Sequence, residues 1–284
     1  MTRAAGWNGW DAIIDLALAE DVGTGDVTTM ATVPVDARSS ARLVAKAEGV
    51  LSGVEVAGAV FRRVDPSIAF TICALDGSHV DEGTVIAEIE GPSHAMLLAE
   101  RTALNLIQHL SGIATLTARY VDAVEGTGAC IVDTRKTMPG LRVVEKSAVR
   151  HGGGRNHRVG LSDGVLIKDN HLAAIGGVDR VTRAIAAARA AAPHTLRVEV
   201  EVTTLDEVRE AVDAAADAIM LDNMGIEEMR EAVGIVGGRS MVEASGGVNL
   251  ATVRLVAETG VDIISVGRLT HSAPALDISL QFAL

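Results

Sequence analysis

Residues that can bind anions gather in one short part of a chain that is acidic overall. Only four of the 25 basic residues are lysines, and three of them, Lys136, Lys146 and Lys168, lie between Asp133 and His171. That segment has a net formal charge of +4, whereas the remainder of the 284-residue chain has −16. Because lysine presents a compact ammonium and arginine a planar fork, the two are not interchangeable at a ligand. The pattern predicts an anion-binding site here.

Several cations of this segment are candidates to bind carboxylates. Arg135 and Lys136 follow the apolar stretch ACIVD, and His157, Arg158 and Lys168 belong to the stretch HGGGRNHRVGLSDGVLIKDNH (151–171). Arginine can hold a carboxylate through two parallel hydrogen bonds. We expect Arg135, His157, Arg158 and Lys168 to neutralise carboxylates of a ligand.

Two glycine-containing stretches are candidates for phosphate binding. Ser245-Gly246-Gly247 precedes an expected helix, and Val266-Gly267 lies in a late loop. Backbone N–H groups in such loops can bind a phosphate.

Two carboxylates are candidate ligands of a metal ion. Glu201 and Asp222 are expected to hold Mg²⁺ directly or through water, because Mg²⁺ prefers a few carboxylates together with substrate phosphates. With the cations, these residues predict a small polyanionic ligand, either an organic diacid or a sugar phosphate, and a divalent metal.

The sequence lacks the patterns of several other chemistries. It has no Gly-x-Ser-x-Gly, no cysteine–histidine nucleophile set and no His-Glu-x-x-His, which disfavours covalent hydrolases and zinc enzymes. No Gly-x-Gly-x-x-Gly follows the first strand of the βα region, which counts against a dinucleotide-binding fold.

An alternation of strands and helices positions these residues. From about residue 124, strands are expected over 129–133, 164–169, 196–202, 218–223, 241–247 and 263–267. Helices are expected over 139–150, 178–192, 204–215, 226–236 and 250–260. Strands that alternate with helices form parallel βαβ units, and about six units fit an α/β barrel. In such barrels the active site lies at the carboxyl ends of the strands, where these polar residues fall.

The stretch RVEVEV (197–202) indicates which side chains face the barrel interior. Alternation places Val198, Val200 and Val202 on one face and Glu199 and Glu201 on the other. Helices should cover the valines, so we expect both carboxylates to point into the barrel.

The first 110 residues have a different pattern. Stretches 42–54, 68–75 and 83–91 resemble strands, and a long helical stretch follows over 94–110. This pattern predicts a smaller domain that mixes strands and helices. The stretch 76–91 is similar to a lipoyl or biotinyl carrier hairpin, but no lysine lies between Lys46 and Lys136 to carry the group.

Composition restricts partners and location. A formal charge of −12 argues against nucleic acid as the main partner. The residues Cys73 and Cys130 form no metal-type spacing, so we expect buried free thiols and a reducing cytoplasm. The N-terminal stretch lacks the apolar core of a signal peptide, and the uncharged run 102–118 is too short and polar to span a membrane.

The chain resembles the quinolinate phosphoribosyltransferases, a type II phosphoribosyltransferase family of NAD synthesis. The similarity runs from about residue 20 to the C-terminus. It is carried by EDVGTGDVTT (20–29), GVLSGV (49–54), AERTALNLIQHLSGIAT (99–115), DTRKTMPGLR (133–142), GGGRNHRVGLSDGVLIKDNH (152–171), EVEV (199–202), LDN (221–223), SGG (245–247) and VGRLTHS (266–272). One departure is Ser147, where the family pattern usually has tyrosine.

The resemblance implies a fold and an assembly. It implies an N-terminal α/β sandwich domain (1–112), completed by the C-terminal tail (270–284), and an incomplete α/β barrel of about six to seven parallel strands (113–269). It also implies a homodimer, or a larger assembly, in which Arg101 of one subunit reaches the site of its neighbour. By itself, Arg101 would be interpreted as an exposed helix residue.

The implied reaction transfers a phosphoribosyl group from phosphoribosyl diphosphate to the nitrogen of quinolinate. Diphosphate and CO₂ are lost and nicotinate mononucleotide forms, with Mg²⁺ as cofactor. Catalytic roles are expected for Lys136, Lys168, Glu201 and Asp222. The substrate site is expected to contain Arg101, Thr134, Arg135, Lys136, His157, Arg158, Lys168, Glu201, Asp222, Ser245, Gly246, Gly247, Val266, Gly267, Arg268 and His271.

Three other functions compete with this interpretation. A related family found in molybdenum-uptake gene clusters shares much of the barrel motif, but the complete EDVGTGDVTT and NHR segments favour the quinolinate enzymes. An isomerase or lyase barrel that binds a sugar phosphate would explain the paired glutamates, but it would not need the cations expected to bind a diacid. A non-catalytic carrier module lacks its lysine.

Overall fold

The computed structural model describes residues 9–283, which form two compact units. The first unit contains the chain up to residue 118, residues 137–153 and the chain from residue 269. The second contains residues 119–136 and 154–268. The domain boundaries expected from the sequence stay a prediction, and their first eight residues and residue 284 lie outside the described residues.

The first unit is built on an antiparallel sheet of order β12-β1-β5-β3. Its strands are β1 (Arg38–Ala45), β3 (Ala69–Ile72), β5 (Val85–Pro92) and β12 (Ile278–Phe282), and β2 (Gly49–Val50) pairs separately with β4 (His79–Val80). The C-terminal strand β12 pairs along β1 from Ala41↔Phe282 to Ala45↔Ile278. The last residues of the chain therefore complete the sheet of the first unit.

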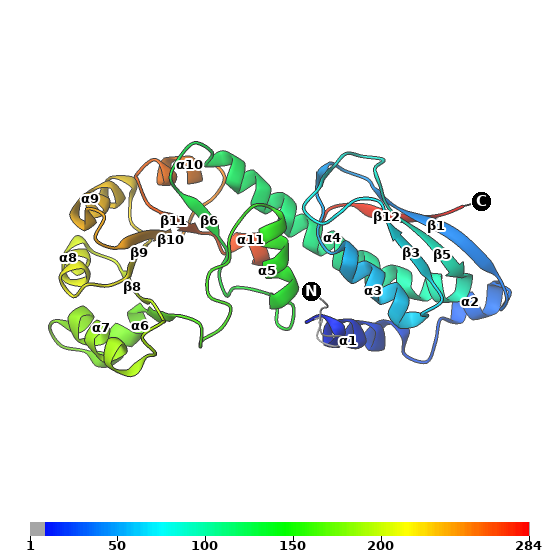
Figure 1. The fold of residues 1–284 in the computed structure, drawn as a ribbon, viewed down its shortest axis with the longest axis horizontal. Helices are drawn as coiled ribbons and strands as arrows, with labels where there is room; N and C mark the ends of the chain where they lie inside the picture. The colour runs from blue at the N-terminus through cyan, green and yellow to red at the C-terminus, as the bar shows by residue number, and fades with distance from the viewer. Residues whose placement is uncertain (1–8, 284) are drawn as a thin grey trace. The chain divides into compact units, whose positions relative to one another are not determined.

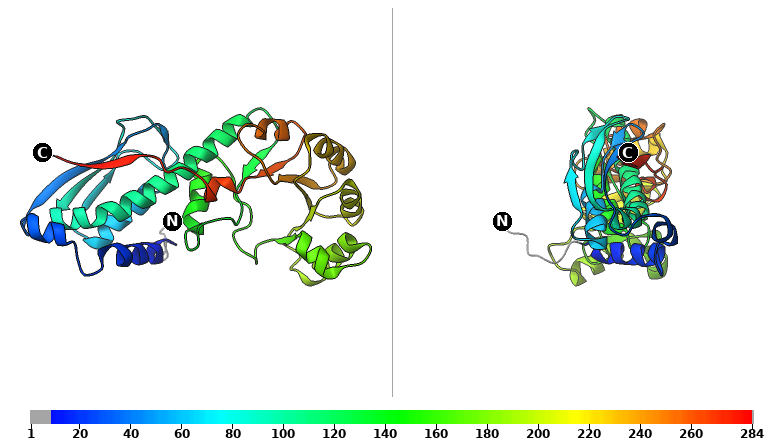
Figure 2. Two further views of the ribbon diagram at one scale, coloured as in Figure 1. Left: turned by 180° about the vertical axis from the view of Figure 1, so that it is seen from behind. Right: turned by 90° about the vertical axis from the view of Figure 1, so that its right-hand side faces the viewer.

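The first unit also contains helices (Figures 1 and 2). They are α1 (Asp11–Val22), α2 (Val27–Thr32), α3 (Val54–Val64), α4 (Ser93–Ala123), which runs on into the second unit, and α5 (Arg142–His151). The helix expected from Pro139 begins at Arg142 instead, because Pro139 and Gly140 lie in a turn closed by Leu141 N–H donating to Met138 C=O. In α5, the Ser147 hydroxyl donates to Val143 C=O at 3.0 Å.

The second unit is an open parallel barrel of order β6-β11-β10-β9-β8-β7 (Figure 1). Its strands are β6 (Cys130–Val132), β7 (Val165–Ile167), β8 (Val198–Val202), β9 (Ala218–Asp222), β10 (Met241–Ser245) and β11 (Ile263–Ser265). This confirms the fold expected from the βα alternation. The strands form in this region because β-branched and aliphatic residues dominate each stretch.

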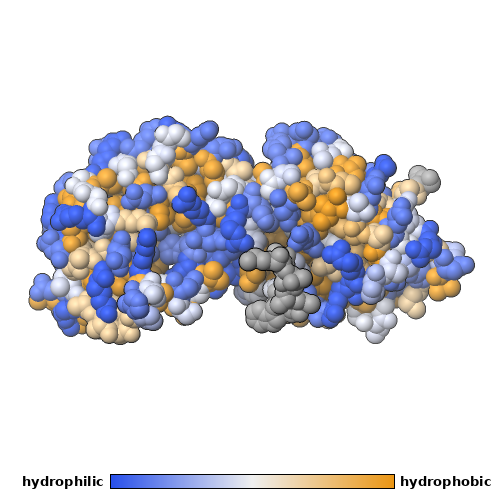
Figure 3. Space-filling model, in the orientation of Figure 1, coloured by the Kyte–Doolittle hydropathy of each residue, from blue (hydrophilic) through white to orange (hydrophobic). Residues whose placement is uncertain are grey.

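Helices surround the outside of the open barrel (Figures 1 and 2). They are α6 (Asp169–Ile175), α7 (Arg180–Ala191), α8 (Leu205–Asp213), α9 (Ile226–Val236) and α10 (Val253–Ala257). The short α11 (Arg268–His271) follows β11 and runs on into the first unit. Hydrophilic residues lie over the outer surface of α8 and α9 in Figure 3. The amphipathic helices therefore turn their apolar faces to the strands.

The barrel is incomplete because its edge strands β6 and β7 do not pair with each other. The segment between them runs alongside β6, where Arg155 N–H donates to Ile131 C=O and Asp133 N–H donates to Arg155 C=O. This pairing carries the next residues, Asn156 to Arg158, past the end of β6.

The structure tests the expected burial of the two cysteines and the expected absence of a membrane span. Both cysteines are free, but the expected burial is wrong for Cys73, which is exposed, and Cys130 is half-buried. Cys73 follows β3, an edge strand whose residues are largely exposed. Within residues 9–283, no helix combines the length and apolar composition needed to cross a bilayer.

Candidate active site

A cavity of about 620 Å³ lies at the carboxyl ends of the barrel strands. Its lining includes the predicted residues Thr134, Arg135, Lys136, His157, Arg158, Lys168, Glu201, Asp222, Ser245, Gly246 and Gly247. It also includes residues for which the sequence predicted no role: Leu166, Met220, Asn223, Glu243 and Ser265. One cavity therefore collects residues from all of the strand ends that were expected to carry the site.

Five predicted residues do not line this cavity. Arg101 is exposed on α4, in the first unit. Val266 is buried, and its N–H donates to Val132 C=O. Gly267, Arg268 and His271 lie in or next to the short α11, where Arg268 and His271 are exposed. Their roles stay a prediction.

Lys168 and Glu201 form an ion pair at the wall of the cavity. Lys168 directly follows β7, and its Nζ donates to Glu201 Oε2 at 2.6 Å. The Glu201 side chain is only 7% exposed, whereas that of Lys168 is 46% exposed. The ammonium is therefore open to a ligand while the carboxylate behind it keeps a partner. His171, at the first turn of α6, accepts a hydrogen bond from Lys168 N–H through Nδ1.

Asn223 links the ends of β9 and β10. It has a left-handed backbone (φ 55°), and its N–H donates to Ser245 C=O at 2.9 Å. Its side-chain amide donates to Asp222 Oδ2 at 2.9 Å. The side chain also lies so close to Gly246 that a Cβ on this glycine would overlap it. Asn223 therefore orients the Asp222 carboxylate and limits residue 246 to glycine.

Two arginines, Arg135 and Arg158, line the cavity. Arg158 Nη1 donates to Gly164 C=O at 3.2 Å. Burial lowers the pKa of Arg158, and the positive charge of Arg135 lowers it further. Because neighbouring like charges repel, an anionic ligand that contacts both would be bound more favourably than a neutral one.

Asp133 holds the loop that brings His157 and Arg158 to the barrel. It is fully buried at the end of β6. Its Oδ1 accepts from the His157 N–H at 2.8 Å, and its Oδ2 accepts from the Asn156 side-chain amide at 2.7 Å. A buried carboxylate that accepts such bonds fixes the path of the loop after its three glycines.

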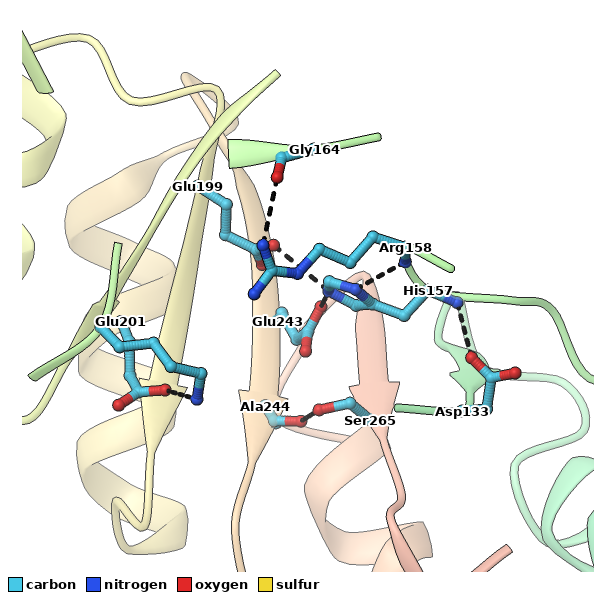
Figure 4. A network of polar contacts seen from close by, with 10 residues as sticks. Asp133, His157, Arg158, Gly164, Glu199, Glu201, Glu243, Ala244 and Ser265 are labelled. Carbon is cyan, nitrogen blue, oxygen red and sulfur yellow. Dashed lines mark hydrogen bonds and ion pairs between the residues drawn. The ribbon is translucent and has the colours of Figure 1, made fainter. Parts of the chain in front are cut away.

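His157 lies inside the barrel between two glutamates (Figure 4). Its Nε2 is 3.2 Å from Glu199 Oε2 on β8 and 3.4 Å from Glu243 Oε2 on β10. The prediction that Glu199 and Glu201 face the barrel interior is therefore confirmed. Glu243 was missed, although the same alternation in MVEAS places it on the inner face with Ser245.

The two glutamates change the protonation of His157. Hydrogen bonds with Glu199 and Glu243 raise the pKa of His157 to about 10. The Arg158 N–H, which donates to Nδ1 at 2.8 Å, opposes a second proton on the ring. Two carboxylates at contact distance outweigh one amide dipole, so the pKa is raised. Burial raises the pKa of Glu199. Whether the His157 ring is neutral or protonated, its Nε2 proton lies between the carboxylates of Glu199 and Glu243.

Two groups of residues have donors that suit a metal ion. His157, Glu199 and Glu243 each place one potential ligand atom within 4.8 Å of the others. However, the distances from Nε2 are those of hydrogen bonds, so a cation would have to displace the shared proton. Glu201 and Asp222 both line the cavity and offer the oxygen donors that Mg²⁺ prefers. The second pair therefore fits the expected Mg²⁺ better.

Comparison with known proteins agrees with this fold and cavity. The model of the C-terminal domain of quinolinate phosphoribosyl transferase matches residues 113–281, and the model of its N-terminal domain matches residues 26–111. The chain belongs to the quinolinate phosphoribosyl transferase family.

Relatives of this family are similar to the chain over nearly its whole length. A chloroplastic nicotinate-nucleotide pyrophosphorylase [carboxylating] from Arabidopsis thaliana is 45% identical over 286 residues, which cover 95% of this chain and 82% of that protein. A probable nicotinate-nucleotide pyrophosphorylase [carboxylating] from Synechocystis is 43% identical over 99% of this chain and 95% of that protein. The crystal structure of NadC from Streptococcus pyogenes has a TM-score of 0.92 and 42% identity, and each chain is fully covered.

Proposed function

We propose that the protein transfers the phosphoribosyl group of phosphoribosyl diphosphate to the nitrogen of quinolinate. The products are nicotinate mononucleotide, diphosphate and CO₂. Membership of the quinolinate phosphoribosyl transferase family supports this function. The observation that carries it is the cavity at the strand ends, where Arg135, Lys136, Arg158 and Lys168 lie together in a chain of net charge −12.

The proposed quinolinate site uses the cations on one side of the cavity. Quinolinate carries two adjacent carboxylates, and Arg135 and Arg158 offer two guanidinium groups whose mutual repulsion such a dianion relieves. The ammonium of Lys168 supplies a third positive charge, which remains accessible while it is paired with Glu201. Charge complementarity thus favours a diacid over a monoacid.

The proposed ribosyl site uses the carboxylates on the other strands. As the bond to diphosphate breaks, positive charge develops on the ribose ring. Glu201 and Asp222 lie in the cavity with their carboxylates held by Lys168 and Asn223, so they can stabilise this charge without reorganising. They are also the residues that would hold Mg²⁺, which neutralises diphosphate when it is bound.

The proposed phosphate contacts come from a lysine and from backbone groups. Lys136 is exposed in the loop after β6, where the Thr134 hydroxyl accepts its N–H at 3.0 Å, and it would bind the departing diphosphate. The loop Ser245-Gly246-Gly247 would bind the 5-phosphate through N–H groups. The expected helix after this loop begins only at Val253, so the loop itself supplies these donors.

Loss of CO₂ needs little help from the protein in this scheme. When the C2–carboxylate bond breaks, its electron pair stays on C2, next to the positively charged ribosylated nitrogen. C2 then takes a proton from water. We therefore assign no separate acid to the decarboxylation.

We also propose that the protein acts in the cytoplasm as a homodimer or a larger assembly. The two free thiols support a reducing compartment. Arg101 is exposed on α4 and lies outside the lining of the cavity, which supports a contribution of this residue to the site of a neighbouring subunit. Such a contribution would add a further cation for the dianion.

The proposed function is tested by incubating the protein with quinolinate, phosphoribosyl diphosphate and Mg²⁺. We expect nicotinate mononucleotide and CO₂ in equal amounts, and loss of activity when a chelator removes the metal. A parallel incubation replaces quinolinate by nicotinate, which has one carboxylate. Equal turnover of nicotinate would contradict the assignment of a site for two carboxylates.

A further inference from the structure

The wall beneath the active-site cavity contains a charged cluster that the proposed chemistry does not use directly. A second hollow of about 430 Å³ lies at the amino ends of the strands and is lined by their first residues, including Ala218, Met241 and Ile263. His157 and Glu243 line both hollows. The cluster of His157, Glu199 and Glu243 therefore forms part of the partition between them.

Stability alone does not account for two carboxylates in this position. Glu243 is 1% exposed and Glu199 is 9% exposed, and barrel interiors are usually filled by branched aliphatic side chains. Replacing a buried ion pair by apolar residues is often neutral or stabilising. In addition, Glu243 Oε1 is buried and has no hydrogen-bond partner among the described residues. The arrangement points to a role in the site above it.

The cluster connects three strands to the loop that carries Arg158. The backbone N–H of His157 is held by Asp133 at the end of β6, and its ring is held by Glu199 on β8 and Glu243 on β10. The direction of the chain at residue 157 is thus fixed from both the backbone and the side chain. Arg158 is the next residue; it lines both hollows, and its guanidinium donates to Gly164 C=O just before β7.

We propose that Glu199 and Glu243 are positioning residues for the anion-binding side of the cavity. By holding the His157 ring inside the barrel, they fix Arg158 where it binds a carboxylate of quinolinate. This inference rests on the proposed function and deepens it. Glu201 and Asp222, the carboxylates proposed for the ribosyl group, are held by Lys168 and Asn223 and not by His157. Loss of Glu199 or Glu243 should therefore affect quinolinate much more than phosphoribosyl diphosphate.

The test substitutes each glutamate by the isosteric glutamine. In Glu243→Gln and Glu199→Gln we expect the KM for quinolinate to rise about tenfold, the size of one lost charge-assisted hydrogen bond. The KM for phosphoribosyl diphosphate should change less than about twofold. Calorimetric titration with quinolinate, without the second substrate, should give the same loss of affinity. In a His157→Gln background, neither substitution should add a further loss.

A matched control is Glu210→Gln on the outer helix α8, where Glu210 accepts a hydrogen bond from Thr182 N–H at 2.8 Å. It should leave both KM values unchanged. If Glu243→Gln does not fold, the less buried Glu199→Gln gives the same comparison. The inference is overturned if both KM values rise together, if only kcat falls, or if neither changes. A wild-type protein that does not convert quinolinate refutes the proposed function itself, whereas a converting protein with unchanged variants refutes only the positioning role.

Discussion

The pair Gly246 and Gly247 offers a sharp test of how the strand-end loop is built. Both glycines have a positive φ, 93° and 64° respectively. A Cβ on Gly247 would meet nothing within 4 Å. A Cβ on Gly246 would overlap the side-chain oxygen of Asn223. It would also lie 2.5 Å from Asn223 Cγ and 3.0 Å from the backbone nitrogen of Asn223. Alanine at either position is therefore strained by its positive φ, but only alanine at 246 also clashes with Asn223.

The expected magnitudes follow from these two costs. A left-handed conformation costs an L-residue about 1–2 kcal/mol, so Gly247→Ala should lower the free energy of unfolding by about that amount. Overpacking against a fixed group typically adds about 1–3 kcal/mol, so Gly246→Ala should lower it by about 2–5 kcal/mol. Displacement of Asn223 also removes the hydrogen bond that orients Asp222. Gly246→Ala should therefore reduce kcat/KM for phosphoribosyl diphosphate more than Gly247→Ala does.

The assay is urea denaturation of each variant, followed by circular dichroism. A second comparison uses Asn223→Gly, which keeps the left-handed backbone of residue 223 and removes the clashing side chain. In that background the difference between the two alanine variants should shrink. Equal destabilisation by Gly246→Ala and Gly247→Ala in the wild-type background would refute the reasoning, because it would mean that Asn223 moves aside without cost.

Three other predictions address charge. Lys136→Ala should lower kcat/KM at least about a hundredfold, the size of the loss of one preorganised charge contact. Because Lys136 is exposed, the free energy of unfolding should change by less than about 0.5 kcal/mol. Activity near that of the wild type would exclude a role for this lysine. If Arg101 acts across an interface, mixing Arg101→Ala subunits with Lys168→Ala subunits should restore part of the activity in verified heterodimers, and no recovery would argue against a shared site. The folded-state pKa of His157 is raised from 6.5 to about 10, so its contribution to stability should be complete below pH 6.5 and be lost as pH rises to about 10. In denaturation measurements over a series of pH values, His157→Gln should flatten this decline. An identical pH profile in the variant would count against the raised pKa.

Much of the barrel could be predicted from local patterns. The helix over 226–236 has the observed bounds of α9, and the alternation in RVEVEV placed Glu199 and Glu201 on the inner face. Such patterns succeed because periodicity depends on neighbours in the chain. Active sites of α/β barrels lie at the carboxyl ends of the strands, and this rule predicted that residues from different strands would share one site.

Other features were missed because their cause lies outside the local sequence. The stretch 42–54 was expected to be a strand throughout, but β1 ends at Ala45 and only Gly49–Val50 extends again before α3. The helix α6 over Asp169–Ile175 is short, and it starts where Lys168 N–H is capped by the His171 ring. The exposure of Cys73 depends on its place after an edge strand, which the order of strands decides.

The sequence by itself determined the alternating elements, the charge of the segment from Asp133 to His171 and the ionisable groups at the strand ends. Only the tertiary structure decided that β6 pairs with β11, that the barrel stays open between β6 and β7, and that His157 meets Glu199 and Glu243 inside it. The physical reason is that side-chain periodicity is set within each element, whereas contacts between distant residues depend on strand order and on the path of the loops. The anion-binding segment thus has one cation, His157, whose ring is held by buried carboxylates within the barrel interior.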